Sequence, residues 1–276
     1  MTDLPRQYAP APLGLVEPHA PLLRVPVDGQ LLYKVMTVEN FLRSVEEGYL
    51  HFNRVDSYGD SPTADQRDGK QLPGDREGNT AAKFTKAPDF SGADYYDRCR
   101  ARTYACCFSL ENSDYIWATY GQGSARGKVC VGFDFAKLRA TLNRTLQSKG
   151  AALLYNGVPC RQLFSVNYGV VEYVDFDSHR ANTTNLPNPI VYTYLKDKQL
   201  FVQEQELRVS LSAIGMGNFI MDDGSEMNFP QSLHMGFDFK SAFADGTIEQ
   251  VLHGLDCDTV FLRAELRRLG AETREG

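Results

Sequence analysis

Hydrophobic and polar positions alternate clearly in residues 200–212, which read LFVQEQELRVSLS. In an extended strand, residues two apart point to the same face. This pattern predicts that Glu204, Glu206 and Arg208 project together. The opposite face would carry the apolar side chains of Leu207, Val209 and Leu211. Because buried charges are costly without partners, the segment is either an exposed edge strand with a solvated polar face or part of a functional site.

The first regular elements are predicted in residues 30–55. Residues 30–35 form a short strand, and residues 49–55 alternate in the manner of a second strand. Between them, apolar residues recur at helical spacing. Thr37 is a suitable N-cap for this helix, and Gly48 ends it. The segment therefore reads strand, short helix, strand.

The chain divides into a central domain with irregular additions. Residues 1–29 contain six prolines, which exclude a helix and indicate an extended or partly disordered arm. Residues 30–265 are predicted to form a single domain. Within it, residues 56–94 form a loop-rich insertion, which is either a mobile lid or a surface excursion. Residues 266–276 are predicted to be a frayed tail.

The remaining elements follow from the same periodicities. Together they predict an α+β fold, with strongly curved mixed or antiparallel sheets and short flanking helices. The predicted strands are 102–110, 127–135, one or two within 162–174, and 259–262; the predicted helices are 93–101, a short one after Asn112 or Ser113, 135–146 and 246–255; residues 175–190 form a loop, residues 190–198 a helix or a strand, and residues 216–229 a hairpin.

An aromatic helix is predicted directly after the strand that ends at Ser109. It holds Trp117, which is the one tryptophan of the chain, and Tyr120 next to a glycine-rich turn. A platform of rings beside a strand end suits a flat ligand. The alternative is that these rings pack the helix against the sheet.

Composition narrows the class of protein. The 276 residues are 42% hydrophobic, which is sufficient for a sizeable core, and the formal net charge is −6. This charge argues against bulk nucleic-acid binding. Six cysteines without a C-x-x-C pair, and five histidines without ligand spacing, argue against zinc. With no apolar run near membrane-spanning length and no signal-peptide pattern, we expect a soluble, reduced, cytoplasmic protein without membrane contact.

Common catalytic motifs are absent from the sequence. There is no G-x-G-x-x-G, Walker lysine loop, H-E-x-x-H or G-x-S-x-G. The DDGSE string at residues 222–226 lacks the twelve-residue loop of a calcium site. The absence of these motifs argues against the common nucleotide-binding and hydrolase templates.

Seven short motifs follow one another in a characteristic order. They are Leu32-Tyr33-Lys34, Gly48-Tyr49-Leu50 to Phe52, Tyr58-Gly59-Asp60-Ser61-Pro62, Cys107-Phe108-Ser109, residues 116–121, residues 127–134, and Glu204-x-Glu206-x-Arg208. This ordered set resembles the bacterial domain-of-unknown-function family numbered 2971, across residues 31–262. In place of the family's Asn-Asp-Pro turn, this chain has Gly59-Asp60-Ser61-Pro62. The family name implies no activity.

The chain is also similar, more weakly, to the ADP-ribosyltransferase fold, which has a split sheet. In that fold a first strand supplies a polar nicotinamide-pocket residue, a middle region supplies Ser, Thr or Tyr, and a late strand supplies the catalytic Glu. The corresponding positions here are Tyr33 and Lys34, then Ser109 or Tyr120, then Glu206 preceded by Glu204. The usual Arg or His of the first strand is missing.

This second resemblance implies an NAD-using transferase that modifies a macromolecule, protein or nucleic acid, as toxins and phage-defence effectors do. Glu206 would bond the ribose hydroxyl and stabilise the developing positive charge, and Glu204 would orient or deprotonate the nucleophile. Tyr120 would stack on the nicotinamide, with Trp117 beside it. Arg208 or Lys34 would hold the NAD pyrophosphate. No metal is required.

Two other classes remain open from the sequence. One is a nuclease or phosphodiesterase that holds magnesium with Asp60, Glu204 and Glu206. The other is a sensor or binding module without catalysis, in which residues 56–94 form the recognition loop. A purely structural arrangement, in which Arg208 neutralises Glu206 within the sheet, is also open.

Overall fold

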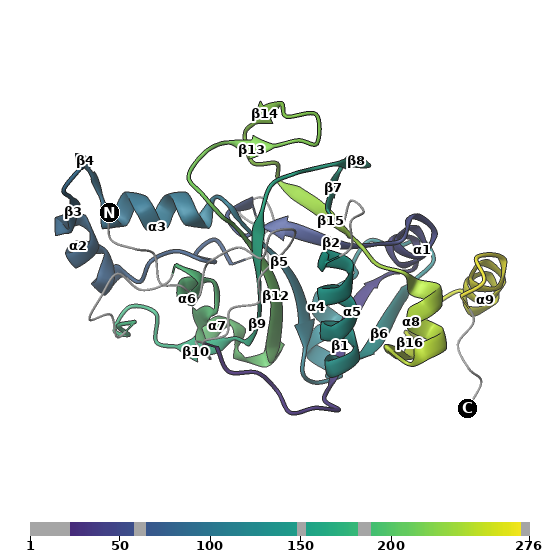
Figure 1. Cartoon of the computed structure of the whole chain (residues 1–276). Helices are drawn as coiled ribbons and strands as arrows, with labels where there is room; N and C mark the ends of the chain where they lie inside the picture. The colour runs from purple at the N-terminus through teal and green to yellow at the C-terminus, as the bar shows by residue number, and fades with distance from the viewer. Residues whose placement is uncertain (1–22, 58–64, 148–152, 182–188, 272–276) are drawn as a thin grey trace.

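The structure is a computed structural model that describes residues 23–57, 65–147, 153–181 and 189–271. A ten-stranded sheet forms its centre (Figure 1), and its neighbouring strands pair antiparallel. The α+β class with an antiparallel sheet is therefore confirmed. The strands of this sheet are β1 (Leu31–Thr37), β2 (Tyr49–Arg54), β5 (Thr103–Ser109), β6 (Lys128–Asp134), β7 (Leu153–Tyr155), β8 (Val158–Pro159), β9 (Phe164–Val170), β12 (Glu206–Ala213), β15 (Ser232–Gly236) and β16 (Ile248–His253).

Short helices surround the sheet, together with three two-stranded sheets (Figure 1). The helices are α1 (Val38–Glu47), α2 (Pro73–Ala81), α3 (Gly92–Arg100), α4 (Asp114–Thr119), α5 (Phe135–Gln147), α6 (Ile190–Thr193), α7 (Lys198–Phe201), the 3₁₀ turn η3 (Val202–Glu204), α8 (Phe239–Asp245) and α9 (Thr259–Arg268). The small sheets are β3 (Lys83–Phe84) with β4 (Ala87–Ser91), β10 (Glu172–Val174) with β11 (Leu195–Asp197), and β13 (Phe219–Ile220) with β14 (Glu226–Met227).

The main sheet forks at β5. Along one edge, β5 pairs with β12 over its whole length. The other edge is shared, because β1 pairs with it at Ser109 and β2 pairs with it at Ala105 and Tyr104. The strands β16, β6 and β1 therefore form one arm of the sheet, and β2, β15, β7 and β8 form the other.

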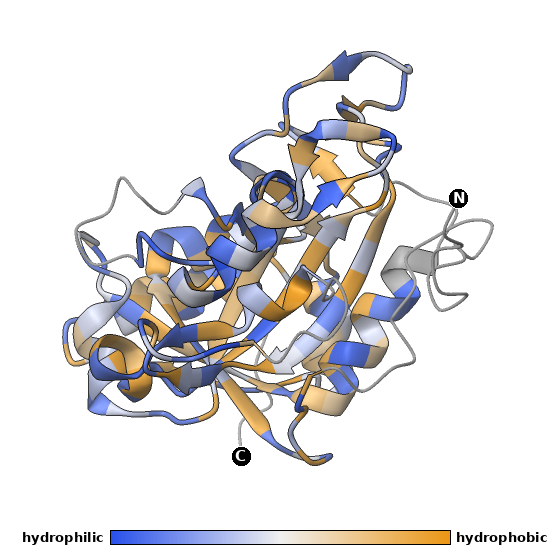
Figure 2. Cartoon of the chain, turned by 90° about the vertical axis from the view of Figure 1, so that its left-hand side faces the viewer, coloured by the Kyte–Doolittle hydropathy of each residue, from blue (hydrophilic) through white to orange (hydrophobic). Residues whose placement is uncertain are grey.

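One face of the sheet carries the main core. Strand alternation places Tyr104, Cys106 and Phe108 of β5 on this face, opposite apolar residues of β12. Apolar side chains of α1, α5, α8 and α9 belong to the same cluster. Figure 2 shows much of the hydrophobic colour on the central strands, while the surrounding loops are mainly hydrophilic. The other face of the sheet is more polar and holds the residues of interest.

The insertion has more structure than its sequence predicts. A short helix was expected near residues 93–101 and is present as α3, whereas α2 was not expected. Leu72 from the insertion and Tyr96 of α3 form a second apolar cluster with residues of segments 174–181 and 192–195. The described part of the insertion is thus packed against the body, which favours the surface excursion over the mobile lid.

Several predicted elements are wrong near the C-terminus. Residues 248–253 form strand β16 rather than a helix, and residues 259–262 begin helix α9 rather than a strand. The carboxylate of Asp258 accepts a hydrogen bond from the Phe261 amide and caps α9. Part of the expected frayed tail is ordered, since α9 continues to Arg268 and Ala271 is buried.

The described part of the N-terminal arm is extended and lies along the sheet edge. The amide of Val170 on β9 donates to the Arg24 carbonyl. Residues 1–22 and 272–276, and the motif at residues 58–62, lie outside the described residues. Among the described helices, none has the length and apolar character needed to cross a membrane.

Candidate functional site

Arg208 lies at the centre of a buried network on the polar face of β12. Its side chain is 1% exposed. The guanidinium donates to both carboxylate oxygens of Glu206, at 2.6 and 3.1 Å, and to both of Asp68, at 2.5 and 2.9 Å. It also donates to the carbonyl of Thr193 at 2.7 Å. These bonds use all five N–H donors of an arginine.

The expectation that Arg208 holds the NAD pyrophosphate is therefore wrong. A phosphate ligand would need an N–H group of Arg208, and none is left once Glu206, Asp68 and Thr193 are bound. The structural interpretation predicted that Arg208 neutralises Glu206 within the sheet. Arg208 does pair with Glu206, and Asp68 is an additional partner.

Glu204 does not lie in the strand, contrary to the prediction for residues 200–212. It ends the turn η3, and β12 begins only at Glu206. Between them, Gln205 adopts a left-handed conformation with φ of 44°, which is uncommon for a residue with a side chain. Despite this turn, the two carboxylates meet at one ammonium group. Lys196 on β11 donates to Glu204 at 2.5 Å and to Glu206 at 3.0 Å.

The surroundings of the two glutamates shift their pKa values in opposite directions. Burial raises the pKa of Glu206, but the charges of Arg208 and Lys196 outweigh burial, so this pKa lies well below its usual range. Burial and then the charge of Glu206 raise the pKa of Glu204, against the opposing effect of Lys196. Glu206 is therefore held ionised, and Glu204 is the carboxylate that takes up a proton more readily.

Tyr120 joins the network at its exposed rim. Its hydroxyl donates to the second carboxylate oxygen of Glu204 at 2.6 Å. Burial and then the charge of Glu204 raise the pKa of this hydroxyl, so it stays protonated, although the residue as a whole is 40% exposed. The structure thus brings Tyr120 next to Glu204, whereas its stacking on nicotinamide stays a prediction.

Ser109 has a structural part in this geometry. It lies opposite Glu206 in the pairing of β5 with β12. Its hydroxyl is within hydrogen-bond distance of the carbonyls of Glu204 and Glu111, at 2.8 Å each, and accepts from the amide of Glu111. The serine thus fixes the turn that carries Glu204.

Trp117 is not brought into this network by any described contact. Its indole N–H donates to Asn112 at 2.8 Å, and its carbonyl accepts from Lys128. Its ring lies near Gly254. These contacts favour the packing interpretation of Trp117 over the ligand platform.

Tyr33 and Lys34, the two site residues that were predicted on the first strand, lie at the fork of the sheet. Tyr33 pairs with Ser109, which puts it on the same sheet face as Glu206. Lys34 donates to the carbonyl of Cys107 at 2.9 Å and lies over the Phe108 ring. Cys107 in turn interacts with Glu206 through a hydrogen bond that helps to lower the pKa of that carboxyl.

Sequence reasoning missed Lys196, Asp68 and Asp65. Lys196 lies in a segment that was predicted only as helix or strand, and both aspartates lie in the insertion. Asp65 is 7% exposed, and one of its carboxylate oxygens is buried without a hydrogen-bond partner. Burial and then the charge of Asp68 raise the pKa of Asp65. No local pattern marks these positions, because their partners are distant in sequence.

The metal-dependent alternative gains no support from the site. No group of three or more His, Cys, Asp or Glu side chains suited to a metal occurs within the described residues. Both oxygens of Glu206 are already bound to cationic side chains. Asp60, the third expected ligand, lies outside the described residues.

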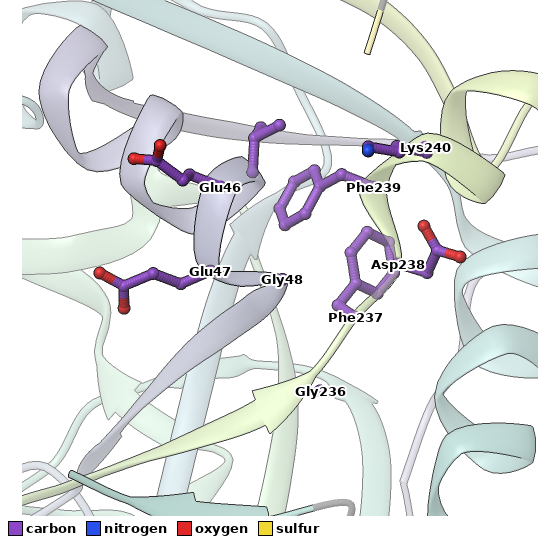
Figure 3. A pocket seen from close by; sticks show the side chains of 9 residues that line it. Glu46, Glu47, Gly48, Gly236, Phe237, Asp238, Phe239 and Lys240 are labelled. Carbon is purple, nitrogen blue, oxygen red and sulfur yellow. The ribbon is translucent and has the colours of Figure 1, made fainter. Parts of the chain in front are cut away.

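A hollow of about 540 Å³ lies elsewhere, between the end of α1 and the start of α8 (Figure 3). Phe237 and Phe239 line it together with the acidic side chains of Glu46, Glu47 and Asp238. The carboxylate of Asp238 caps α8, and Glu46 is paired with Arg268. Because these carboxylates have structural partners or face solvent, we place the candidate site at the buried network and not at this hollow.

Comparisons of the chain with protein-family models, with curated proteins and with solved structures found no match. The functional argument therefore depends on the geometry of the site.

Proposed function

We propose that this protein is an enzyme that breaks the nicotinamide–ribose bond of NAD and transfers the ADP-ribosyl group to a macromolecule. The supporting observation is the pair of carboxylates at Lys196, one held ionised and one with a raised pKa. Pairs of titratable groups whose environments separate their pKa values are typical of acid–base sites.

In this proposal Glu204 is the catalytic residue. When the bond between ribose C1′ and the nicotinamide nitrogen breaks, nicotinamide leaves with the electron pair. The nucleophile of the acceptor then bonds to C1′, and its proton moves to Glu204. A raised pKa suits a general base, because the base then holds the transferred proton more firmly. Tyr120 orients the carboxylate through its hydroxyl.

Glu206 and Lys196 are positioning residues in this proposal. The carboxylate of Glu206 is bound by Arg208 and Lys196, so it acts on the substrate through Lys196 and its charge. This reverses the expected order of the two glutamates, in which Glu206 touched the ribose. The forked sheet resembles the split sheet expected for an ADP-ribosyltransferase-like fold, and it supports the proposal by analogy alone.

The test is nicotinamide release and label transfer after incubation of the full chain with labelled NAD and a cell lysate. Glu204→Gln keeps the shape of the side chain but removes its basicity, so we expect the rate to fall about 100-fold or more. Glu249→Gln changes an exposed glutamate on β16 and should leave the rate unchanged.

Two results would contradict the proposal. If the unmodified protein releases no nicotinamide and transfers no label, NAD is not its substrate, and the binding-module alternative gains ground. If Glu204→Gln retains full activity while its melting temperature is unchanged, Glu204 is not the catalytic carboxylate.

A further inference from the structure

A second buried arginine lies at the end of β12 that is opposite to Glu206. Arg102 directly precedes β5, and its carbonyl accepts a hydrogen bond at 3.1 Å from the amide of Ala213, the last residue of β12. The residue is 5% exposed. Because Glu206 and its partner Lys196 lie at the start of β12, Arg102 is separate from the carboxylate network.

The guanidinium of Arg102 donates no hydrogen bond to a described residue. Its Nε is enclosed and without a partner, and its terminal amino groups take part in no described hydrogen bond or ion pair. The ring of Phe229 lies against the guanidinium, with Cζ 4.5 Å from the ring centroid. This contact covers a face of the guanidinium, whereas the N–H bonds lie in its plane. Arg102 therefore keeps donors that Arg208 has already used.

The ring of Phe229 is held in a fixed position beside Arg102. It packs edge-on against Phe219, with the ring centroids 5.5 Å apart, and its carbonyl accepts a hydrogen bond from the guanidinium of Arg54. The carbonyl of the next residue, Pro230, accepts from the hydroxyl of Tyr104 at 2.8 Å. This segment follows the hairpin β13–β14, which projects from the body (Figure 1). The unpaired guanidinium thus has a fixed aromatic wall.

The carboxylates of the segments around Arg102 are bonded to other residues. These segments are α3, the hairpin β13–β14 and the end of β2. The pairs are Asp94 with Ser91, Asp97 with Arg76 and Gln71, Asp222 with Arg161, Asp223 with Ser225, Glu226 with Asn218, and Asp56 with Arg54.

Arg102 therefore carries a positive charge that no described side chain neutralises. Burial lowers the pKa of its guanidinium, and the charge of Arg98 adds to this effect. Burial raises the pKa of the neighbouring Cys99 thiol to about 11, so the thiol is uncharged at neutral pH. Because an arginine keeps its proton in proteins, the unpaired charge persists in the folded chain. A buried charge of this kind is stabilised by an ion of opposite sign.

A carboxylate is the anion that suits this group. It is planar and offers two acceptor oxygens, which match the fork of a guanidinium in its own plane. Its single negative charge equals the single unpaired charge of Arg102. A phosphate monoester carries about −1.5 to −2 charge at pH 7, which one guanidinium leaves partly unneutralised. The ring of Phe229 favours a carboxylate that is joined to an apolar group.

We propose that Arg102, with Phe229 as its apolar wall, forms a binding site for an organic monocarboxylate at the end of β12 remote from Glu206. The terminal amino groups of Arg102 donate to the carboxylate, and the apolar part of the ligand lies beside the ring. This site does not depend on the proposed reaction with NAD.

An NMR titration of the full chain in a chloride buffer tests the site with two acids and their uncharged amides. Benzoate is a free acid, and N-acetyl-leucine ends as a peptide does; benzamide and N-acetyl-leucinamide lack the charge. We expect at least one acid to bind, and its amide to bind at least about tenfold more weakly. A preference for either acid supports the site and assigns its carboxylate to a free molecule or to a peptide end.

Substitutions of Arg102 connect the binding to this residue. Arg102→Met should weaken binding of the acid about tenfold or more, through loss of the bidentate bond. Arg102→Lys keeps the charge but not the planar fork, and should weaken binding about threefold or more. Because the arginine leaves no buried partner behind, the melting temperature of Arg102→Met should be unchanged or higher.

Two control variants should bind the acid as the unmodified protein does. Arg263→Met removes an exposed arginine of α9, and Glu204→Gln changes only the proposed catalytic residue. The site is overturned if the unmodified protein binds neither acid, or if it binds each acid and its amide equally. Binding at full strength by both Arg102→Met and Arg102→Lys would overturn it as well.

Discussion

The two faces of β12 are buried to the same depth by different interactions. On one face Leu207, Val209 and Leu211 are 0% exposed and pack into the main core. On the other face, Arg208 is 1% exposed and Ser210 0%, and both meet polar partners from other segments. The apolar face requires only neighbours of suitable volume, whereas the polar face requires each donor to find an acceptor.

This difference implies different tolerances to change. A missing methyl group leaves a cavity into which neighbours can partly relax. A missing charge on the polar face leaves its partners buried and unpaired, so the penalty falls on residues that were not changed. We therefore expect that the removal of one charged side chain disrupts the whole buried network.

The largest loss in the free energy of unfolding is expected for Arg208→Met. This change leaves the carboxylates of Glu206 and Asp68 buried beside a single lysine, and we expect a loss of about 3–5 kcal/mol in the free energy of unfolding. Urea denaturation measures it. Arg161→Met, which breaks an exposed pair with Asp222 at 3.1 Å, should cost less than about 1 kcal/mol. Equal losses for the two variants would contradict the network.

A smaller effect is expected on the apolar face. Leu211→Ala should reduce the free energy of unfolding by about 3 kcal/mol, through lost burial and the cavity that remains. The same denaturation measurement applies. Nicotinamide release measured below the unfolding transition should be unchanged, and a large loss of activity in folded Leu211→Ala would show that the two faces are not independent.

Tyr120→Phe removes one hydroxyl group at the exposed rim of the polar face. The variant loses the bond to Glu204, which we expect to cost about 1 kcal/mol of stability. It should also slow nicotinamide release, since Glu204 loses its orienting partner. Tyr115→Phe in α4, the helix that ends just before Tyr120, provides the control. Release at the unmodified rate by Tyr120→Phe would remove this tyrosine from the site.

The smallest expected effect is the change in stability with pH. Burial is the main cause that lowers the pKa values of His51 and His234 in the folded protein. As pH falls below about 6.5, the unfolded chain takes up protons that the folded protein resists, so stability should decline. Thermal melts between pH 8 and 5 measure this decline. The double change His51→Phe with His234→Phe should flatten the profile, and a profile as steep as before would assign the decline to other groups.

The elements predicted correctly are those with complete local signals. Thr37 accepts a hydrogen bond from the Asn40 amide, and Gly48 ends α1 with φ of 69°, as their residue types predict. The hairpin of β13 with β14 and the helix α5 also agree with their sequence patterns.

The elements predicted wrongly are those that distant contacts decide. Ile248, Val251 and Leu252 have a spacing typical of a helix, yet the segment pairs with β6 and becomes a strand. In the site, too, the residues that depend on distant contacts were not predicted. Alternation indicated that Glu206 and Arg208 share a face, but Lys196 and Asp68 could not be found, because their roles arise only when remote segments meet.

The contact between Arg208 and Asp68 joins residues 140 positions apart in the chain. Closing so long a loop costs chain entropy before the ion pair forms. We therefore expect this contact to be absent from the folding transition state and to form late. It would then act mainly on the unfolding rate, so that the buried network sets how long each molecule stays folded rather than how fast it folds.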